Sequence, residues 1–162
     1  MTKFLRVLKQ LLCTVIILVS IPQPSQAAET LQEIKQQFQG DFELVSYFQF
    51  PEKGDPIDMN YVGRLSYDKF DNMAGLGMPR DLPERNQGSE ERVTGGFAYW
   101  GKVSFDLANS LVIHHVEGAP MVPEWVGGDN VRHFEFSDGL LKLSLKNDAG
   151  RTTATLSWRK LH

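Results

Sequence analysis

Apolar and polar residues alternate along most of the chain after residue 40, which is the pattern of half-buried β-strands. The alternation is clearest over residues 95–107, where Phe97, Tyr99 and Val103 share one face and Lys102 lies on the other. Turn residues separate the alternating segments, so we expect neighbouring strands to be antiparallel. The predicted strands are residues 41–50, 61–68, 72–78, 95–107, 110–117, 130–137, 140–146 and 151–160.

One segment ahead of the strands has a helical period instead. Ile34 and Phe38 are four residues apart, and Thr30 is placed to cap a first turn together with Glu33. We therefore predict one short helix over residues 30–39.

The order of these elements predicts an all-β fold. Eight sequential strands, without the long crossovers that parallel strands need, favour an eight-stranded antiparallel up-and-down barrel, with a two-sheet sandwich as the alternative. A barrel of this size is filled by side chains or holds one small ligand. The apolar loop 118–128 contains Trp125, so we expect it to fold back over one barrel mouth.

The first 27 residues have the layout of a secretory signal peptide. Three basic residues open the segment, an apolar run over residues 11–21 follows, and small residues precede Ala27. The apolar run is shorter than the ~20 residues that span a bilayer, so we predict cleavage after Ala27 rather than a retained anchor. The protein is then exported, to the periplasm or the extracellular space, as one β-barrel domain of residues 28–162 without a stable membrane anchor.

Cleavage would leave an acidic domain without cysteine. The chain has 17 basic and 20 acidic residues, and the signal segment removes three basic ones, so the mature formal charge falls from −3 to −6. An acidic domain argues against a nucleic-acid partner. Cys13 is the sole cysteine and lies in the signal segment, so disulfides and thiolate metal sites are excluded from the mature domain.

Four short blocks of the chain carry a resemblance to a known family: residues 40–46, 63–68, 114–118 and 156–159. Together they resemble the lipocalin-like domain family of bacterial and fungal proteins, and His-His-Val-Glu-Gly at 114–118 is the most specific block. The resemblance implies a lipocalin-like β-barrel, in agreement with the strand pattern. Phe42 stands where the family usually has tryptophan. The fold hosts carriers, enzymes and inhibitors, so the resemblance by itself implies no activity.

The segment from residue 112 to residue 136 concentrates the polar side chains that a functional site needs. His115 and Glu117 are two residues apart on one predicted strand, so both side chains leave the same face, which we predict to be the barrel interior. A buried carboxylate needs a cation. Arg132, on the next strand and on the same face as Phe134, is the expected partner.

Four interpretations of this cluster follow from the residue types. In the first interpretation, these side chains form a structural polar cluster. In the second, Arg132, His115 and Tyr99 orient the polar end of a small apolar molecule. Alternatively, His115 and Glu117 act as an acid/base pair. A metal site of His115, Glu117 and His133 is the fourth interpretation.

We predict that the protein binds a small, largely apolar molecule and carries no cofactor and no metal. The alternatives are an enzyme of isomerase or hydrolase type, with His115 and Glu117 as the candidate catalytic residues, and a structural or partner-binding envelope protein with a filled barrel. Nothing in the sequence marks a nucleophile, so no catalytic residue is assigned. The predicted ligand-binding residues are Tyr99, His115, Glu117, Trp125, Arg132 and Phe134.

Overall fold

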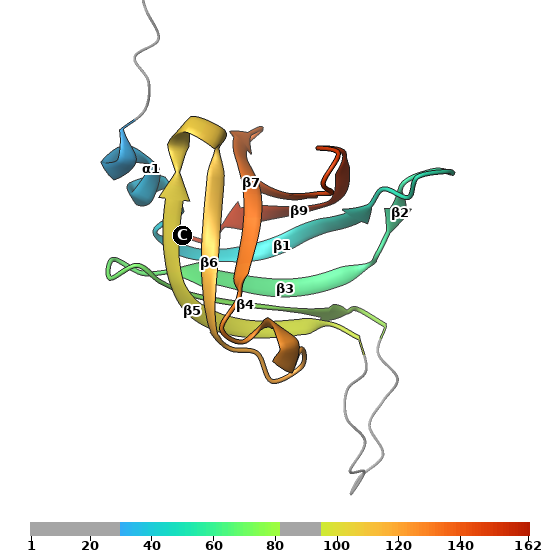
Figure 1. Ribbon diagram of the computed structural model, residues 1–162, viewed down its shortest axis with the longest axis horizontal. Coiled ribbons are helices and arrows are strands. Elements are labelled where there is room, and N and C mark those ends of the chain that lie inside the picture. The colour runs from blue at the N-terminus through green and yellow to red at the C-terminus, as the bar shows by residue number, and fades with distance from the viewer. Residues whose placement is uncertain (1–29, 82–94) are drawn as a thin grey trace, which may run out of the picture.

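A computed structural model describes residues 30–81 and 95–162, and the predicted signal peptide, residues 1–27, lies outside them. Within the described residues, eight long strands form one closed antiparallel barrel (Figure 1). These strands are β1 (Gly40–Gln49), β3 (Tyr61–Tyr67), β4 (Asn72–Pro79), β5 (Phe97–Asp106), β6 (Leu111–Gly118), β7 (Asp129–Ser137), β8 (Leu140–Lys146) and β9 (Thr152–Lys160). Both ends of every long strand lie within two residues of the positions that the sequence predicts.

The strand order confirms the predicted up-and-down barrel and excludes the sandwich. Each long strand pairs with the next one along the chain, and β1 also pairs with β9, which closes the sheet. A two-residue strand, β2 (Ile57–Asp58), extends the far end of β1. Between β7 and β8, Asp138 and Gly139 have φ angles of 56° and 73°. Positive φ at both central positions is typical of the tight hairpin turn that Asp-Gly favours.

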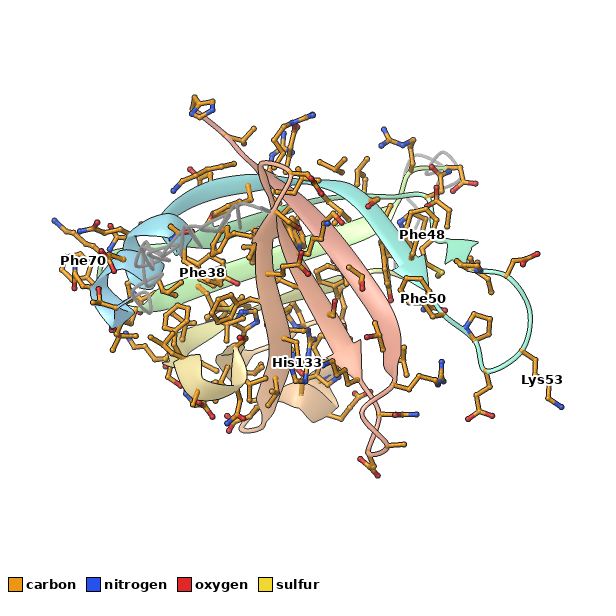
Figure 2. The ribbon with its side chains drawn as sticks, turned by 90° about the horizontal axis from the view of Figure 1, so that it is seen from above. Phe38, Phe48, Phe50, Lys53, Phe70 and His133 are labelled. Carbon is orange, nitrogen blue, oxygen red and sulfur yellow. The ribbon has the colours of Figure 1, made fainter. Side chains whose placement is uncertain are left out.

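Helix α1 (Leu31–Phe38) closes one end of the barrel. Thr30 and Glu33 form the predicted capping box, which satisfies the first free backbone N–H groups of the helix. The ring of Phe38, only 1% exposed, projects into the barrel, whereas Phe70 on a nearby turn points to solvent (Figure 2). The Phe38 ring meets four other rings edge-on, at centroid distances of 4.8–5.3 Å: Tyr67, Phe105, Phe134 and Phe136.

The opposite end of the barrel carries the loop between β6 and β7 (Figure 1). This loop contains a short 3-10 turn, η2 (Pro123–Trp125), and the Trp125 ring packs edge-on against Tyr99 at 5.5 Å. The apolar loop therefore does fold back onto the barrel, as its sequence predicts. No helix in the described part of the chain is long and apolar enough to cross a membrane.

Candidate ligand-binding site

A cavity of about 130 Å³ lies inside the barrel between the aromatic layer around Phe38 and the end that carries η2. Most of the side chains around it are leucines and aromatic residues, and the only charged one is Arg132. The lining residues are Tyr47, Leu65, Gly75, Phe97, Tyr99, Trp125, Arg132, Leu143, Leu145, Leu156 and Trp158.

Two glycines of β4 make room for the aromatic side chains of β5. Gly75 pairs with Tyr99, and Gly77 pairs with Phe97. A Cβ atom at Gly77 would lie 2.7 Å from the Phe97 ring, so only glycine lets that ring lie against the barrel wall. With these rings against the wall, part of the interior at this end stays open as the cavity.

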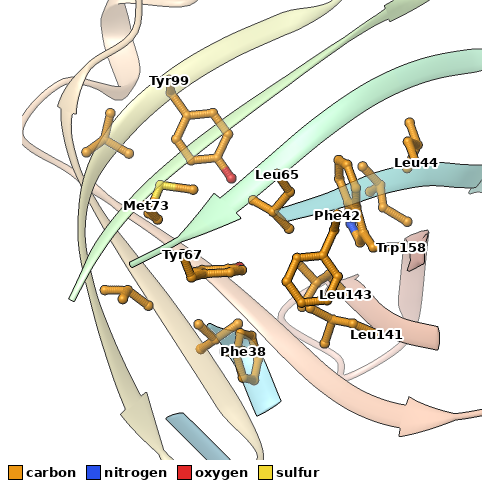
Figure 3. Packing of buried hydrophobic residues seen from close by; sticks show 14 of the residues in the cluster. Phe38, Phe42, Leu44, Leu65, Tyr67, Met73, Tyr99, Leu141, Leu143 and Trp158 are labelled. Carbon is orange, nitrogen blue, oxygen red and sulfur yellow. The ribbon is translucent and has the colours of Figure 1, made fainter. Parts of the chain in front are cut away.

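His114 forms the centre of a buried polar network beneath the cavity. Its side chain is fully buried, with Nε2 2.8 Å from the hydroxyl of Tyr67 and Nδ1 2.9 Å from the hydroxyl of Tyr99. Tyr99, Tyr67 and Phe38 follow one another along the barrel axis (Figure 3). The network therefore separates the cavity from the Phe38 layer.

The His114 network is electrically neutral. Burial, reinforced by electrostatic repulsion from the nearby Arg132 and His115 side chains, lowers the pKa of His114 to about 3. Burial also raises the pKa of Tyr67 and of Tyr99 above the usual value for a phenol. A neutral imidazole has one N–H donor and one acceptor. One tyrosine hydroxyl therefore donates to His114, and the other accepts from it.

Arg132 brings to the cavity a positive charge that no other described residue compensates. The side chain is half-buried, and one Nη atom donates to the carbonyl oxygen of Val131 at 2.8 Å. Among the described residues, no carboxylate lies within 4.0 Å of the guanidinium, and none lines the cavity. Arginine has five N–H donors in a planar fork that matches a carboxylate. Within residues 30–81 and 95–162 only one hydrogen bond uses these donors, so the others can serve a bound group.

Trp158 contributes a second unused donor to the same region. The residue is 2% exposed and lines the cavity, yet its indole Nε1 has no hydrogen-bond partner in the described part of the chain. A buried N–H without a partner costs free energy unless a ligand or water accepts from it.

The structure brings together three of the six predicted ligand-binding residues. Tyr99, Trp125 and Arg132 line the cavity. Phe134 points inward, as predicted, but it packs against Phe38 at the other end and does not line the cavity.

The prediction that His115 and Glu117 face the interior is wrong. On β6 the buried residues are Val112, His114, Val116 and Gly118, while Glu117 is exposed and His115 is partly exposed. His114 pairs across the sheet with Val103, which is buried on the face of β5 that it shares with Tyr99, as the alternation predicts. Because cross-strand partners share a face, His114 must also point inward.

The predicted cluster of Arg132, His115 and Glu117 therefore does not form, because Arg132 lies inside the barrel and the other two lie outside. His115 instead contacts Ser104 and Asp129. Within the described residues, no three potential ligands gather to hold a metal, so His115, Glu117 and His133 make no such group.

Sequence reasoning placed His114 outside, so it missed the buried network. Residues 111, 112, 113 and 116 are all apolar, so alternation alone does not choose a face on this strand. The pairing of β5 with β6 carries the missing signal, because the inward Val103 and Phe105 oppose His114 and Val112.

A closed eight-stranded antiparallel barrel with an internal cavity is the architecture of proteins that bind one small ligand. This chain belongs to the lipocalin-like domain family, whose family model matches residues 39–161.

Two solved structures of similar proteins come from Bacteroides species. A lipocalin-like protein from Bacteroides uniformis is 14% identical, with a TM-score of 0.46, and the match covers 76% of this chain and 98% of that one. An uncharacterized protein from Bacteroides eggerthii is 15% identical, with a TM-score of 0.41, and the match covers 76% of this chain and 99% of that one. No curated protein sequence matches the chain.

Proposed function

We propose that the protein binds a small, largely apolar molecule that carries one anionic group, with the anion held by Arg132. The observation that carries this proposal is the uncompensated guanidinium of Arg132 in the wall of an otherwise apolar cavity. A half-buried charge without a partner is unfavourable, and a ligand carboxylate would supply the missing partner.

The cavity limits the size of the apolar part. Its volume of about 130 Å³ is close to that of the ~150 Å³ engineered protein cavity that binds benzene. The expected ligand therefore has a single ring or a short chain, rather than the size of a typical drug molecule, whose pockets start at about 300 Å³.

The remaining polar groups of the wall favour a ligand with acceptors. Trp158 Nε1–H has no partner among the residues that the structure describes, and the Tyr99 hydroxyl is hydrogen-bonded to the neutral His114. Neither group carries a negative charge that would repel an anion. The Trp125 and Phe97 rings offer flat apolar contact on the mouth side.

Native mass spectrometry of gently purified protein, combined with analysis of an organic extract, tests the proposal. We expect a reproducible added mass of a small organic acid that disappears in Arg132→Ala. Arg64→Ala is the matched control, because Arg64 lies on the outer face and contacts Glu43, so its loss leaves the bound mass unchanged. A bound mass that persists in Arg132→Ala would contradict the role of Arg132.

We also propose that the protein is exported after cleavage behind Ala27. The support is the basic, apolar and small-residue order of the first 27 residues. Expression of the full chain in a bacterium, followed by fractionation and intact-mass measurement, tests this. A mature protein beginning at Ala28 outside the cytoplasm is expected, and an uncleaved cytoplasmic chain would contradict it.

A further inference from the structure

We propose that Ser104, His115 and Asp129 form a Ser-His-Asp catalytic triad on the outer face of the barrel, which cleaves carboxylic esters. The Ser104 Oγ lies 2.8 Å from His115 Nε2, and the Asp129 Oδ1 lies 2.6 Å from His115 Nδ1. A nucleophile hydrogen-bonded to a base, with the base oriented by a carboxylate on its other nitrogen, is the arrangement that defines such triads on unrelated folds.

Three adjacent strands hold these side chains in a row. His115 on β6 pairs directly with Asp129 on β7, and Ser104 on β5 pairs with Ile113, two residues before His115. The loop before Asp129 is fastened to β6 by hydrogen bonds from Gly127 N–H to the Val116 carbonyl and from Val116 N–H to the Gly128 carbonyl. The carboxylate is therefore fixed by the sheet rather than by a free loop.

The contacts also orient the imidazole for catalysis. An ionised carboxylate only accepts hydrogen bonds, so Asp129 requires the proton of a neutral His115 to be on Nδ1. Nε2 then carries the lone pair that faces the Ser104 hydroxyl. This is the tautomer in which histidine removes a proton from serine.

The site is open to substrate. The side chains of His115 and Asp129 are 44% and 56% exposed, and Ser104 is partly exposed. Because these residues point away from the barrel interior, the proposed reaction is independent of the Arg132 cavity and of its ligand.

The reaction has two balanced steps. The Ser104 Oγ attacks the ester carbonyl carbon while its proton passes to His115 Nε2, and the same proton then goes to the departing alkoxide as its C–O bond breaks. Water then attacks the carbonyl carbon of the Ser104 ester while one of its protons passes to His115 Nε2, and that proton goes to Ser104 Oγ as the bond between Oγ and the acyl carbon breaks. The products are the carboxylic acid, the alcohol and free Ser104.

The antiparallel sheet also limits the rate of the proposed ester cleavage. The backbone N–H groups of an antiparallel sheet are used in its ladder, so they are not free to stabilise an oxyanion. Loss of one such donor costs about 10²–10³ in kcat in enzymes that have one. We therefore expect slow turnover, measurable with an activated ester such as p-nitrophenyl acetate.

The experiment measures p-nitrophenyl acetate cleavage by the full-length protein, together with the mass and position of any acetyl adduct. We expect an adduct on Ser104 in the wild-type protein and a rate at least about tenfold lower in Ser104→Ala and His115→Ala. Asp129→Asn is expected to lower the rate as well, since it removes the group that fixes the tautomer.

Ser144→Ala is the matched control. Ser144 lies on β8, and its hydroxyl contacts Thr155 rather than an imidazole, so its loss is expected to leave the rate unchanged. A thermal unfolding curve for each variant shows whether the fold is retained. No cleavage above buffer, or cleavage that persists at the wild-type rate in a folded Ser104→Ala variant, would overturn the proposal. An acetyl group found only on His115 or on lysines would overturn it too.

Discussion

The imidazole of His114 and the phenol of Tyr67 meet inside the barrel, with 2.8 Å between Nε2 and the hydroxyl oxygen. The other nitrogen of His114 is held in the same way by Tyr99. This buried network ties β3, β5 and β6 together through side chains. It also forms the polar boundary between the Phe38 layer and the ligand cavity.

His114 makes stability depend on pH. Its pKa is about 3 in the folded protein because of burial, against about 6.5 for an unfolded histidine. Between these values the unfolded chain binds a proton that the folded protein does not. The free energy of unfolding therefore falls as the pH falls from about 6.5 towards 3, by on the order of 1 kcal/mol per pH unit from this residue.

Urea unfolding at pH 4, 5, 6 and 7 checks this dependence. His114→Gln is expected to have a shallower pH slope than the wild type over pH 4–6, even though it is less stable at pH 7. His162→Gln removes an exposed imidazole near the chain end and serves as the control. Equal slopes in the wild type and His114→Gln would show that His114 is not neutral in the folded protein.

Removing either phenol hydroxyl leaves His114 with an unsatisfied nitrogen. We expect Tyr67→Phe and Tyr99→Phe each to lower the free energy of unfolding by about 1–3 kcal/mol. Tyr61→Phe is the comparison, because the Tyr61 hydroxyl makes no hydrogen bond to the described residues, and it should cost far less. Chemical denaturation at pH 7 measures all three, and a Tyr61→Phe effect as large as the others would contradict the network.

Phe38 is the residue through which α1 stabilises the barrel. Phe38→Ala removes a ring that is 1% exposed and contacts four other rings, so we expect a loss of about 3–5 kcal/mol. Leu31→Ala on the same helix truncates a side chain that is 47% exposed and should change stability by about 0.5 kcal/mol or less. Thermal or urea unfolding distinguishes the two, and similar losses would mean that α1 does not act through Phe38.

Gly101 is required by the close approach of β5 and β6. A Cβ atom at this position would lie 1.9 Å from the backbone oxygen of His115, beside the irregularity in the pairing at Trp100 and Gly101. We expect Gly101→Ala to distort the pairing of the two strands and to lower the melting temperature. Gly128→Ala, whose nearest neighbour would be 3.4 Å away, is the milder comparison and should be tolerated better.

The sequence predicts the fold better than it predicts the site, for a physical reason. Strand positions follow from local alternation and turn residues, and the capping box at Thr30 is also local. Local sequence does not determine which face of β6 points into the barrel. Apolar residues occur on both sides of that strand, and its orientation depends on the register with β5, where Val103 opposes His114.

The cavity depends on the same non-local information. Arg132, Tyr99 and Trp125 were predicted because their own strands and loop have clear patterns. The contribution of Trp158 to the wall follows from the pairing of β1 with β9, which closes the sheet, and the room left by Gly75 follows from its pairing with Tyr99. The row of Ser104, His115 and Asp129 likewise joins three strands, so no sequence motif marks it.

The affinity of one matched ligand pair tests the central claim most directly. Calorimetric titration with benzoate and with benzyl alcohol compares an anionic and a neutral group on the same ring. A charged hydrogen bond is worth about 1.5–3 kcal/mol, so the wild type is predicted to bind benzoate at least about tenfold more tightly. Arg132→Met keeps the apolar stem and should abolish that preference. Equal binding of both compounds to the wild type, or a preference that persists in Arg132→Met, would contradict an anion site at Arg132.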